Sequence, residues 1–323
     1  EPLWAKTNPY RGLAAFTEND AEFFFGRESL IQELSDKVRH QRFIAVVGPS
    51  GSGKSSVVQA GLLLKLPKDW QVIKLRPGND PYANEEWQMA NGKPSADSPV
   101  RRYVIFIDQF EELFALCTPD VQTRFQDDVQ ALIAGAAPIT VILTLRADFF
   151  GYLQNSPLGH HLEHALVNVL PMAPDDLRAA IANPAKAVGL RFEAGLVETI
   201  MEDAQRARHT LPLLQFALTQ LWEQQTRGTL TYDAYVAAGR VAGAIGLRAE
   251  DTYNELTSAE QQIARRVFTR LVHYGEGDAA DTRQRRAFPE LLTHPDERAA
   301  LHRLLHRLAD ARLATTGEAQ GVE

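Results

Sequence analysis

One glycine-rich segment has the residue types and spacing of a phosphate-binding loop. Residues 48–55 read Gly-Pro-Ser-Gly-Ser-Gly-Lys-Ser and match the pattern G-x-x-x-x-G-K-[ST] in full. Glycine tolerates a positive φ, so the backbone N–H groups of such a loop can turn toward phosphate oxygens at the start of a helix. The pattern places Lys54 on the β and γ phosphates and the Ser55 hydroxyl on Mg²⁺. The predicted phosphate-binding residues are Gly48, Ser50, Gly51, Ser52, Gly53, Lys54, Ser55 and Ser56.

Magnesium held by such a loop needs a second ligand, usually a carboxylate at the end of a neighbouring strand. Asp108 follows the apolar run Tyr103–Ile107 and is the predicted ligand. The next residue is Gln109, where many ATPases with this loop carry the glutamate that orients water, so we expect slow hydrolysis. Glu111 and Glu112 are both candidates for the catalytic base, and the sequence does not choose between them.

A further charged side chain stands at the end of another apolar run. Arg146 comes directly after Ile139–Leu145, which we expect to lie beside the strand that enters the loop. An arginine at that position can pair with γ-phosphate oxygens and so distinguish ATP from ADP. The predicted catalytic residues are Lys54, Asp108, Glu111, Glu112 and Arg146.

The elements that must position these residues alternate between strand and helix in the first half of the chain. Helical spacing is expected over Ser55–Leu64 and again over Val121–Ile133. The expected strands are Phe43–Val47, Val72–Leu75, Tyr103–Ile107, Ile139–Leu145 and Ala165–Leu170. Strand, helix and strand in succession indicate a parallel α/β sheet. The polar stretch 76–102 fits this pattern poorly, and we expect a short helix at 83–90 within a mobile segment or one with residues missing.

After Pro171 the pattern becomes helical. The expected helices are Asp175–Val188, Phe192–Ala204, Leu211–Trp222, one that opens with a capping box of Thr257 and Glu260, and Leu301–Leu308. A strand is expected at Ala311–Thr316. We therefore predict three domains: residues 1–170 bind nucleotide, 171–250 form a helical lid, and 251–323 form a further small domain.

The composition narrows the class of protein. The 323 residues include 45% hydrophobic and 23% charged side chains, which are average values for globular proteins. The net charge of −7 argues against a general nucleic-acid binder. The single cysteine, Cys117, indicates a reducing compartment, so we expect a cytoplasmic protein. The longest apolar stretch, 132–145, is interrupted and shorter than the ~20 residues of a membrane span, so no membrane partner is expected.

Together these motifs resemble the STAND class of P-loop ATPases, which includes the NACHT and NB-ARC switches, and in particular its prokaryotic novel-STAND branch. Phe24-Phe25-Gly26-Arg27-Glu28 is similar to the hhGRE element of the class, and Asp108-Gln109-Phe110-Glu111-Glu112 to its acidic motif. Arg146 matches its first sensor. Thr210-Leu211-Pro212 is similar to its Gly-x-Pro element, although threonine replaces the glycine.

The resemblance implies a fold and a mode of action. The fold is an ASCE-type P-loop sheet domain followed by a helical domain and a winged-helix domain. The bound nucleotide is ATP or ADP with Mg²⁺, where Gly26, Arg27 and Glu28 lie by the adenine and ribose and Pro212 packs on the adenine. The protein is then a signal-transduction switch, monomeric with ADP and homo-oligomeric with ATP, in bacterial immunity or regulation. Effector and sensor domains are expected outside this chain, and the winged helix is expected to be truncated.

Two alternatives remain open. One is a DNA-binding ATPase of the AAA or origin-recognition type, which also joins a helical lid to a winged helix. Residues 251–323 carry 10 basic and 12 acidic side chains, a net charge of −2, so nucleic acid is not expected as a partner of this region. The other is a small-molecule kinase, for which the C-terminal half offers no recognisable acceptor site.

Overall fold

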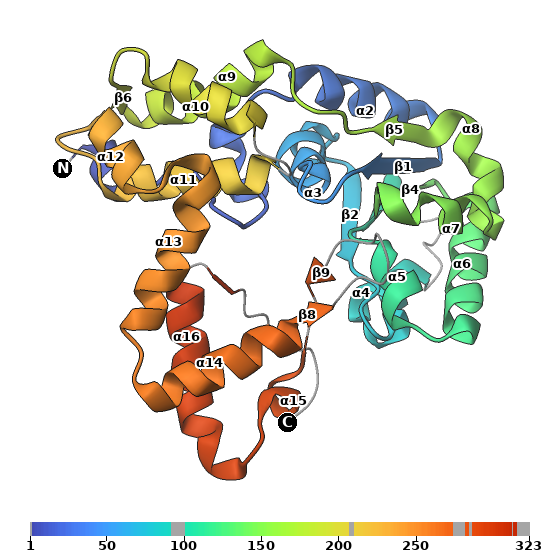
Figure 1. Ribbon diagram of the computed structural model, residues 1–323. Helices are drawn as coiled ribbons and strands as arrows, with labels where there is room; N and C mark the ends of the chain where they lie inside the picture. Colours follow the sequence, from blue (N-terminus) through green and yellow to red (C-terminus); the bar gives the residue numbers. More distant parts are fainter. Residues whose placement is uncertain are drawn as a thin grey trace.

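The computed structural model describes residues 2–91, 101–206, 210–273, 282–283, 286–311 and 313–314. Its first half contains a five-stranded parallel sheet with strand order β2-β3-β4-β1-β5 (Figure 1). The strands are β1 Phe43–Gly48, β2 Trp70–Leu75, β3 Arg102–Ile107, β4 Ile139–Arg146 and β5 Leu166–Asn168. All five expected strands are present, and β4 lies between β1 and β3 as the ASCE-type P-loop fold requires.

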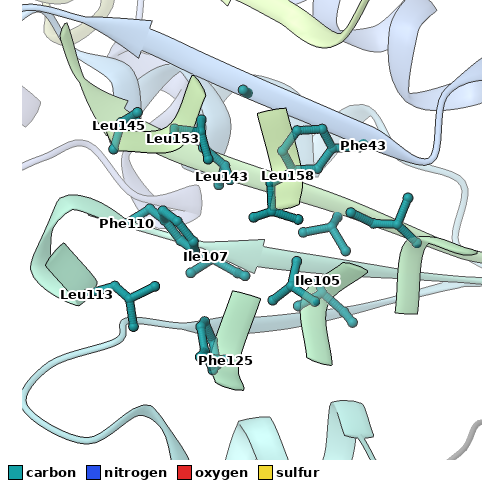
Figure 2. Packing of buried hydrophobic residues seen from close by; sticks show 14 of the residues in the cluster. Phe43, Ile105, Ile107, Phe110, Leu113, Phe125, Leu143, Leu145, Leu153 and Leu158 are labelled. Atoms are coloured by element: carbon teal, nitrogen blue, oxygen red, sulfur yellow. The ribbon is translucent and has the colours of Figure 1, made fainter. Parts of the chain in front are cut away.

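Helices cover both faces of this sheet because its central strands are buried on both sides. In β1, Phe43, Ala45 and Val47 face one hydrophobic cluster, while Ile44 and Val46 face another. Figure 2 shows the first cluster, where Phe125 packs beneath the sheet residues. The helices of this half are α1 Leu3–Lys6, α2 Glu28–His40, α3 Lys54–Ser56, α4 Glu85–Asn91, α5 Glu111–Leu116, α6 Pro119–Ala134, α7 Phe150–Gln154 and α8 Leu162–Ala165.

The helix after the phosphate loop changes type within a few residues. It begins as α3, continues as a π-helix over Val57–Leu62 and ends as a 3₁₀ turn over Leu63–Lys65. The helix expected over Ser55–Leu64 is therefore present, although most of it is wider than an α-helix.

The second half is helical, as expected. Its helices are α9 Pro174–Val188, α10 Leu196–Arg206, α11 Thr210–Glu223, α12 Tyr232–Ala237 and α13 Arg240–Asn254. The prediction that a helix begins at Phe192 is wrong, because β6 (Arg191–Phe192) pairs with β7 (Thr229–Leu230). Gly195, with a φ of 82°, separates this strand from α10.

The last part contains α14 Ser258–Leu271, β8 Val272–His273, β9 Thr282–Arg283, α15 Phe288–Leu291 and α16 Arg298–Asp310. Thr257 and Glu260 form the expected capping box at the start of α14. Half of the strand expected at Ala311–Thr316 lies outside the described residues, and the described ones, Ala311, Leu313 and Ala314, form a turn and a bend instead of a strand. The boundary predicted between residues 250 and 251 falls within α13, and the next buried cluster begins at Leu256.

The polar stretch after β2 is described as far as residue 91, and α4 is the short helix expected there. Residues 92–100 lie outside the described part. None of the helices in the described ranges is both long enough and apolar enough to cross a bilayer.

Candidate functional site

Strand register brings the predicted site residues to one edge of the sheet. Gly48 at the end of β1 is level with Arg146 at the end of β4. In the register of β3 and β4, Ile107 pairs with Leu143, so Asp108, which directly follows β3, lies at the same edge. Because parallel strands end at a common edge, the phosphate loop, the acidic motif and the arginine meet there.

The phosphate loop has the conformation that its glycines predict. Gly51 and Gly53 adopt φ values of 73° and 89°. The Nζ of Lys54 is buried and donates hydrogen bonds to the carbonyl oxygens of Gly48 (2.9 Å) and Pro49 (2.8 Å). Burial lowers the pKa of this lysine, and the negative charge of Glu111 opposes that shift. A phosphate anion would offer the ammonium group stronger acceptors than these carbonyls.

A second observation also fits an anion in this loop. The Ser52 hydroxyl is buried and has no hydrogen-bond partner among the described residues. An unpaired buried donor is costly, and a phosphate oxygen would satisfy it. Ser50 lies at the exposed tip of the loop. The loop therefore fits the nucleotide phosphates that its sequence predicts.

The two predicted metal ligands lie in direct contact. Asp108 is 3% exposed, and its Oδ1 accepts hydrogen bonds from Ser55 Oγ (2.6 Å) and Thr144 Oγ1 (2.7 Å). A carboxylate and a hydroxyl at this separation match the hard oxygen ligands that Mg²⁺ prefers. Thr144 was not among the predicted site residues. Its place near the end of β4, one strand from Asp108, is the signal that could have identified it.

Arg76 is a second residue that the sequence analysis did not identify. Its Nη2 lies 2.9 Å from Asp108 Oδ2. The contact follows from register, because Leu75 pairs with Ile107 and the next residue of each strand is therefore level with the other. In the sequence Arg76 only marks the start of the poorly patterned stretch 76–102.

The two adjacent glutamates at the start of α5 point to different partners. Glu111 Oε2 accepts a hydrogen bond from the backbone N–H of Arg146 (3.3 Å), whereas Glu112 Oε2 accepts one from that of Gly78 (3.2 Å). Burial raises the pKa of Glu111, and the charge of Lys54 is among the opposing effects. Glu111 thus shares the buried environment of the phosphate loop, while Glu112 bonds the turn after β2.

Arg146 lies at the expected edge and is engaged with an acid. Its Nη2 and Nε bond Asp148 Oδ2 (2.6 Å) and Oδ1 (3.1 Å). Its charge also contributes to the lowered pKa of Lys54, which places the two cations near each other. The guanidinium would have to leave Asp148 to make two bonds to a phosphate.

The Gly26-Arg27-Glu28 element contacts the phosphate loop through the side chain of Arg27. Arg27 donates from Nη1 to the carbonyl oxygen of Leu170 (2.8 Å) and from Nη2 to that of Ser52 (3.1 Å). Glu28 accepts a hydrogen bond from the Gly26 amide (3.1 Å), so it shapes the turn. Arg27 therefore ties the phosphate loop to the segment that follows β5.

Gly26 is required at this turn for two reasons. Its φ is 81°, and an added Cβ would overlap the backbone carbonyl oxygen of Asp176 in α9. Gly26→Ala should lower the free energy of unfolding by about 3 kcal/mol, because a left-handed residue and an overpacked contact are both introduced. Gly195→Ala is the matched control, because φ is 82° there and no atom lies within 4 Å of the added Cβ. It should cost only about 1 kcal/mol in denaturant unfolding, and equal losses would contradict the packing argument.

The helical part reaches the phosphate loop through the first turn of α11. A Cβ built on Gly51 would lie 2.9 Å from Pro212 Cγ, and one on Gly53 would lie 3.9 Å from Leu211 Cδ1. Pro212 therefore packs directly against the loop. The side chain of Thr210, where the related element has glycine, lies outside the described residues.

The N-terminal segment joins the same two parts. The Ser56 hydroxyl, just after the loop, accepts a hydrogen bond from the backbone N–H of Phe16 (3.1 Å). The fully buried Tyr10 donates from its hydroxyl to the carbonyl oxygen of Ile181 in α9 (2.7 Å). The N–H of Arg11 donates to Gln215 Oε1 in α11 (3.2 Å). Residues 10–16 thus connect the loop helix to two helices of the second half.

One protein family matches nearly the whole chain. The family described as Novel STAND NTPase 1 matches residues 9–323. The zinc import ATP-binding protein ZnuC of Wigglesworthia glossinidia brevipalpis is 37% identical over 51 residues, which are 16% of this chain and 22% of that protein. The chain thus matches about a fifth of the length of this curated relative.

Two solved structures are similar in fold. The Walker-type ATPase PABY2304 of Pyrococcus abyssi has a TM-score of 0.50 at 13% identity, over 96% of this chain and 93% of its own. The Orc1 protein of Aeropyrum pernix, solved in complex with DNA, has a TM-score of 0.46 at 14% identity, over 90% and 85% of the two chains. At these identities the first likeness supports the P-loop ATPase fold and nothing finer.

Proposed function

This chain belongs to the Novel STAND NTPase 1 family, and from that premise we propose that it is an ATP/ADP-dependent signal-transduction switch with slow ATP hydrolysis. The observation that carries the proposal is the contact of Pro212 in α11 with Gly51 of the phosphate loop. A nucleotide bound in the loop would directly affect the packing of Pro212 against Gly51. The packing of the helical part would then report whether ATP or ADP is bound.

The proposed nucleotide site uses the residues at the sheet edge. Residues 48–56 would hold the phosphates, with Lys54 on the β and γ groups. Ser55 and Asp108 would hold Mg²⁺, which supplies positive charge to the phosphates when bound. Glu111 is the proposed base that accepts a proton from water, because it shares the environment of Lys54. Glu112 is engaged with the Gly78 amide and is assigned no catalytic role.

Three connections would transmit the nucleotide state. Pro212 contacts the loop itself, Arg27 bonds the loop carbonyl of Ser52, and the Phe16 amide bonds Ser56 directly after the loop. A hundredfold shift between two packings requires about 2.7 kcal/mol of differential binding. One charged hydrogen bond to a γ-phosphate, worth about 1.5–3 kcal/mol, is of that size.

The remaining organisation is part of the same proposal. Residues 1–170, 171–250 and 251–323 would act as nucleotide-binding, lid and winged-helix units. We propose a monomer with ADP and a homo-oligomer with ATP, with effector and sensor domains supplied outside this chain. A switch set by the ATP to ADP ratio would act in the cytoplasm.

Extraction of nucleotide from the purified protein tests the proposal. The protein should be denatured and its supernatant separated by ion-exchange chromatography. We expect close to one equivalent of ADP per chain, because Pro212 closes against the loop. A supernatant without adenine nucleotide, from protein that also fails to bind added ATP and ADP, would reject the assigned site.

Arg146→Ala should reduce the distinction between ATP and ADP. Loss of a charged contact to the γ-phosphate should weaken ATP binding about tenfold and leave ADP affinity within about twofold. Titration with fluorescent analogues of both nucleotides measures this ratio. Arg178→Ala, which removes an exposed pair with Glu198, is the control and should change neither affinity. Equal losses of ATP and ADP affinity in Arg146→Ala would mean that this arginine is structural.

A further inference from the structure

The pair formed by Arg76 and Asp108 places a fixed positive charge at the proposed metal site. Asp108 is nearly fully buried, and its Oδ1 already accepts two hydroxyl donors, from Ser55 and Thr144. Its Oδ2 bonds Arg76 at 2.9 Å. A guanidinium and a divalent cation are both attracted to a single buried carboxylate, and they repel each other at short range.

Two contacts besides the pair with Asp108 hold Arg76 in place. Its backbone carbonyl accepts a hydrogen bond from Asn84 Nδ2 (2.7 Å). In the amide orientation that satisfies both groups, Gln109 accepts from Arg76 Nη2 (3.3 Å) and donates to Glu112 Oε1 (3.0 Å). Gln109 has a φ of 56°, a conformation that is costly outside glycine and that aims its side chain at this network. These contacts orient the guanidinium toward Asp108.

Space for another position of the arginine lies beside the pair. A pocket of about 290 Å³ is lined by Arg76 and Asp108 together with Gln59, Lys74, Asn84 and Glu86. Glu86 offers a second carboxylate in that pocket, whereas Lys74 is paired with Glu18 (2.8 Å). The guanidinium can therefore leave Asp108 without losing an acidic environment.

We propose that Arg76 is a built-in counter-cation that Mg²⁺ must displace from the carboxylate of Asp108. The inference rests on the proposed nucleotide site and adds a threshold Mg²⁺ concentration for metal binding at that site. Magnesium would bind with ATP only above the concentration at which it outcompetes the guanidinium. Displacement would also reach residues 76–84, because Asn84 and the Gly78 amide belong to the same network.

The test is the Mg²⁺ dependence of ATP binding, measured with a fluorescent ATP analogue in EDTA and at increasing Mg²⁺. Arg76→Met should lower the Mg²⁺ concentration for the half-maximal effect about fivefold, which is about 1 kcal/mol. Its affinity for the analogue at saturating Mg²⁺ should equal that of wild type. Arg76→Lys keeps a charge on a shorter stem and should show a midpoint between the two.

Lys74→Met is the matched control, since it removes a cation from the same strand that bonds Glu18 instead of Asp108. It should leave the Mg²⁺ midpoint unchanged. A midpoint in Arg76→Met equal to wild type would overturn the inference, whatever its melting temperature, because a purely structural arginine would change only stability. Weaker binding at saturating Mg²⁺ would also overturn it and would make Arg76 a phosphate ligand. If wild type fails to bind the analogue at any Mg²⁺ concentration, the proposed function itself has failed.

Discussion

Lys54→Ala is expected to raise the dissociation constants for both ATP and ADP at least about a hundredfold. The ammonium group is buried in the loop and bonds two backbone carbonyls, so it is already placed where phosphate oxygens would accept its protons. Two charge-assisted hydrogen bonds of about 1.5 kcal/mol each account for a loss of this size. Isothermal titration with each nucleotide measures it.

The matched control for this change is Lys65→Ala. Lys65 is exposed at the end of the same helical stretch, where its loss removes one positive charge outside the loop. Nucleotide affinity should stay within about twofold of wild type in this variant. Retained nucleotide in purified Lys54→Ala would contradict the assignment of residues 48–56 as the phosphate site.

Glu111→Gln is expected to reduce the rate of ATP hydrolysis at least about a hundredfold while ATP binding is kept. A general base contributes about 10²–10⁴-fold, and the amide cannot accept the proton from water. Glu112→Gln is the matched control on the neighbouring residue, and it should keep most of the activity because Glu112 bonds the Gly78 amide. A larger loss of hydrolysis rate in Glu112→Gln than in Glu111→Gln would mean that Glu112 is the base.

The pH dependence of hydrolysis follows from the same residue. Burial raises the pKa of Glu111 above its ordinary value, so the carboxylate becomes protonated at a higher pH than a solvent-exposed glutamate. Hydrolysis should therefore fall on the acid side at a higher pH than it would with a solvent-exposed glutamate as the base, and this limb should be absent from the residual rate of Glu111→Gln.

The charged form of Glu111 should support hydrolysis but lower the free energy of unfolding. Because its pKa is raised in the folded state, the folded chain binds more protons than the unfolded chain over that range, and the charged form costs stability as the pH rises. Glu111→Gln should therefore not lower the melting temperature at neutral pH. A destabilised variant would indicate that the lost activity reflects unfolding.

The five strands of the parallel sheet and the phosphate loop were predictable because local patterns determine them. Fully buried strands appear as continuous apolar runs, and the loop pattern specifies four positions within eight consecutive residues. Asp108 and Arg146 were predictable for the same reason, since each follows such a run directly. The start of α10 was mispredicted because Phe192 fits the apolar spacing of the helix, whereas the pairing of β6 with β7 depends on residues far apart in sequence.

Arg76 and Thr144 could not be identified because their roles depend on strand order. Only when β3 is known to lie between β2 and β4 does register bring both side chains to Asp108. The proposal of Glu111 over Glu112 as the base likewise needed the fold, since it depends on which neighbour each carboxylate meets at the start of α5. The contact of Pro212 with Gly51 joins residues from separate halves of the chain and was not predicted, because the resemblance implies only that Pro212 packs on the adenine.

The central claim, that nucleotide state controls the packing of the helical part on the phosphate loop, is tested most directly by amide hydrogen exchange. Exchange should be compared with saturating Mg²⁺-ADP and with a non-hydrolysable ATP analogue, over residues 10–24 and 211–223. We predict faster exchange in both segments with the ATP analogue, because the contact of Pro212 and the bonds of Phe16 and Arg11 would loosen. Identical exchange in the two nucleotides, with both bound at the loop, would contradict a switch of this kind.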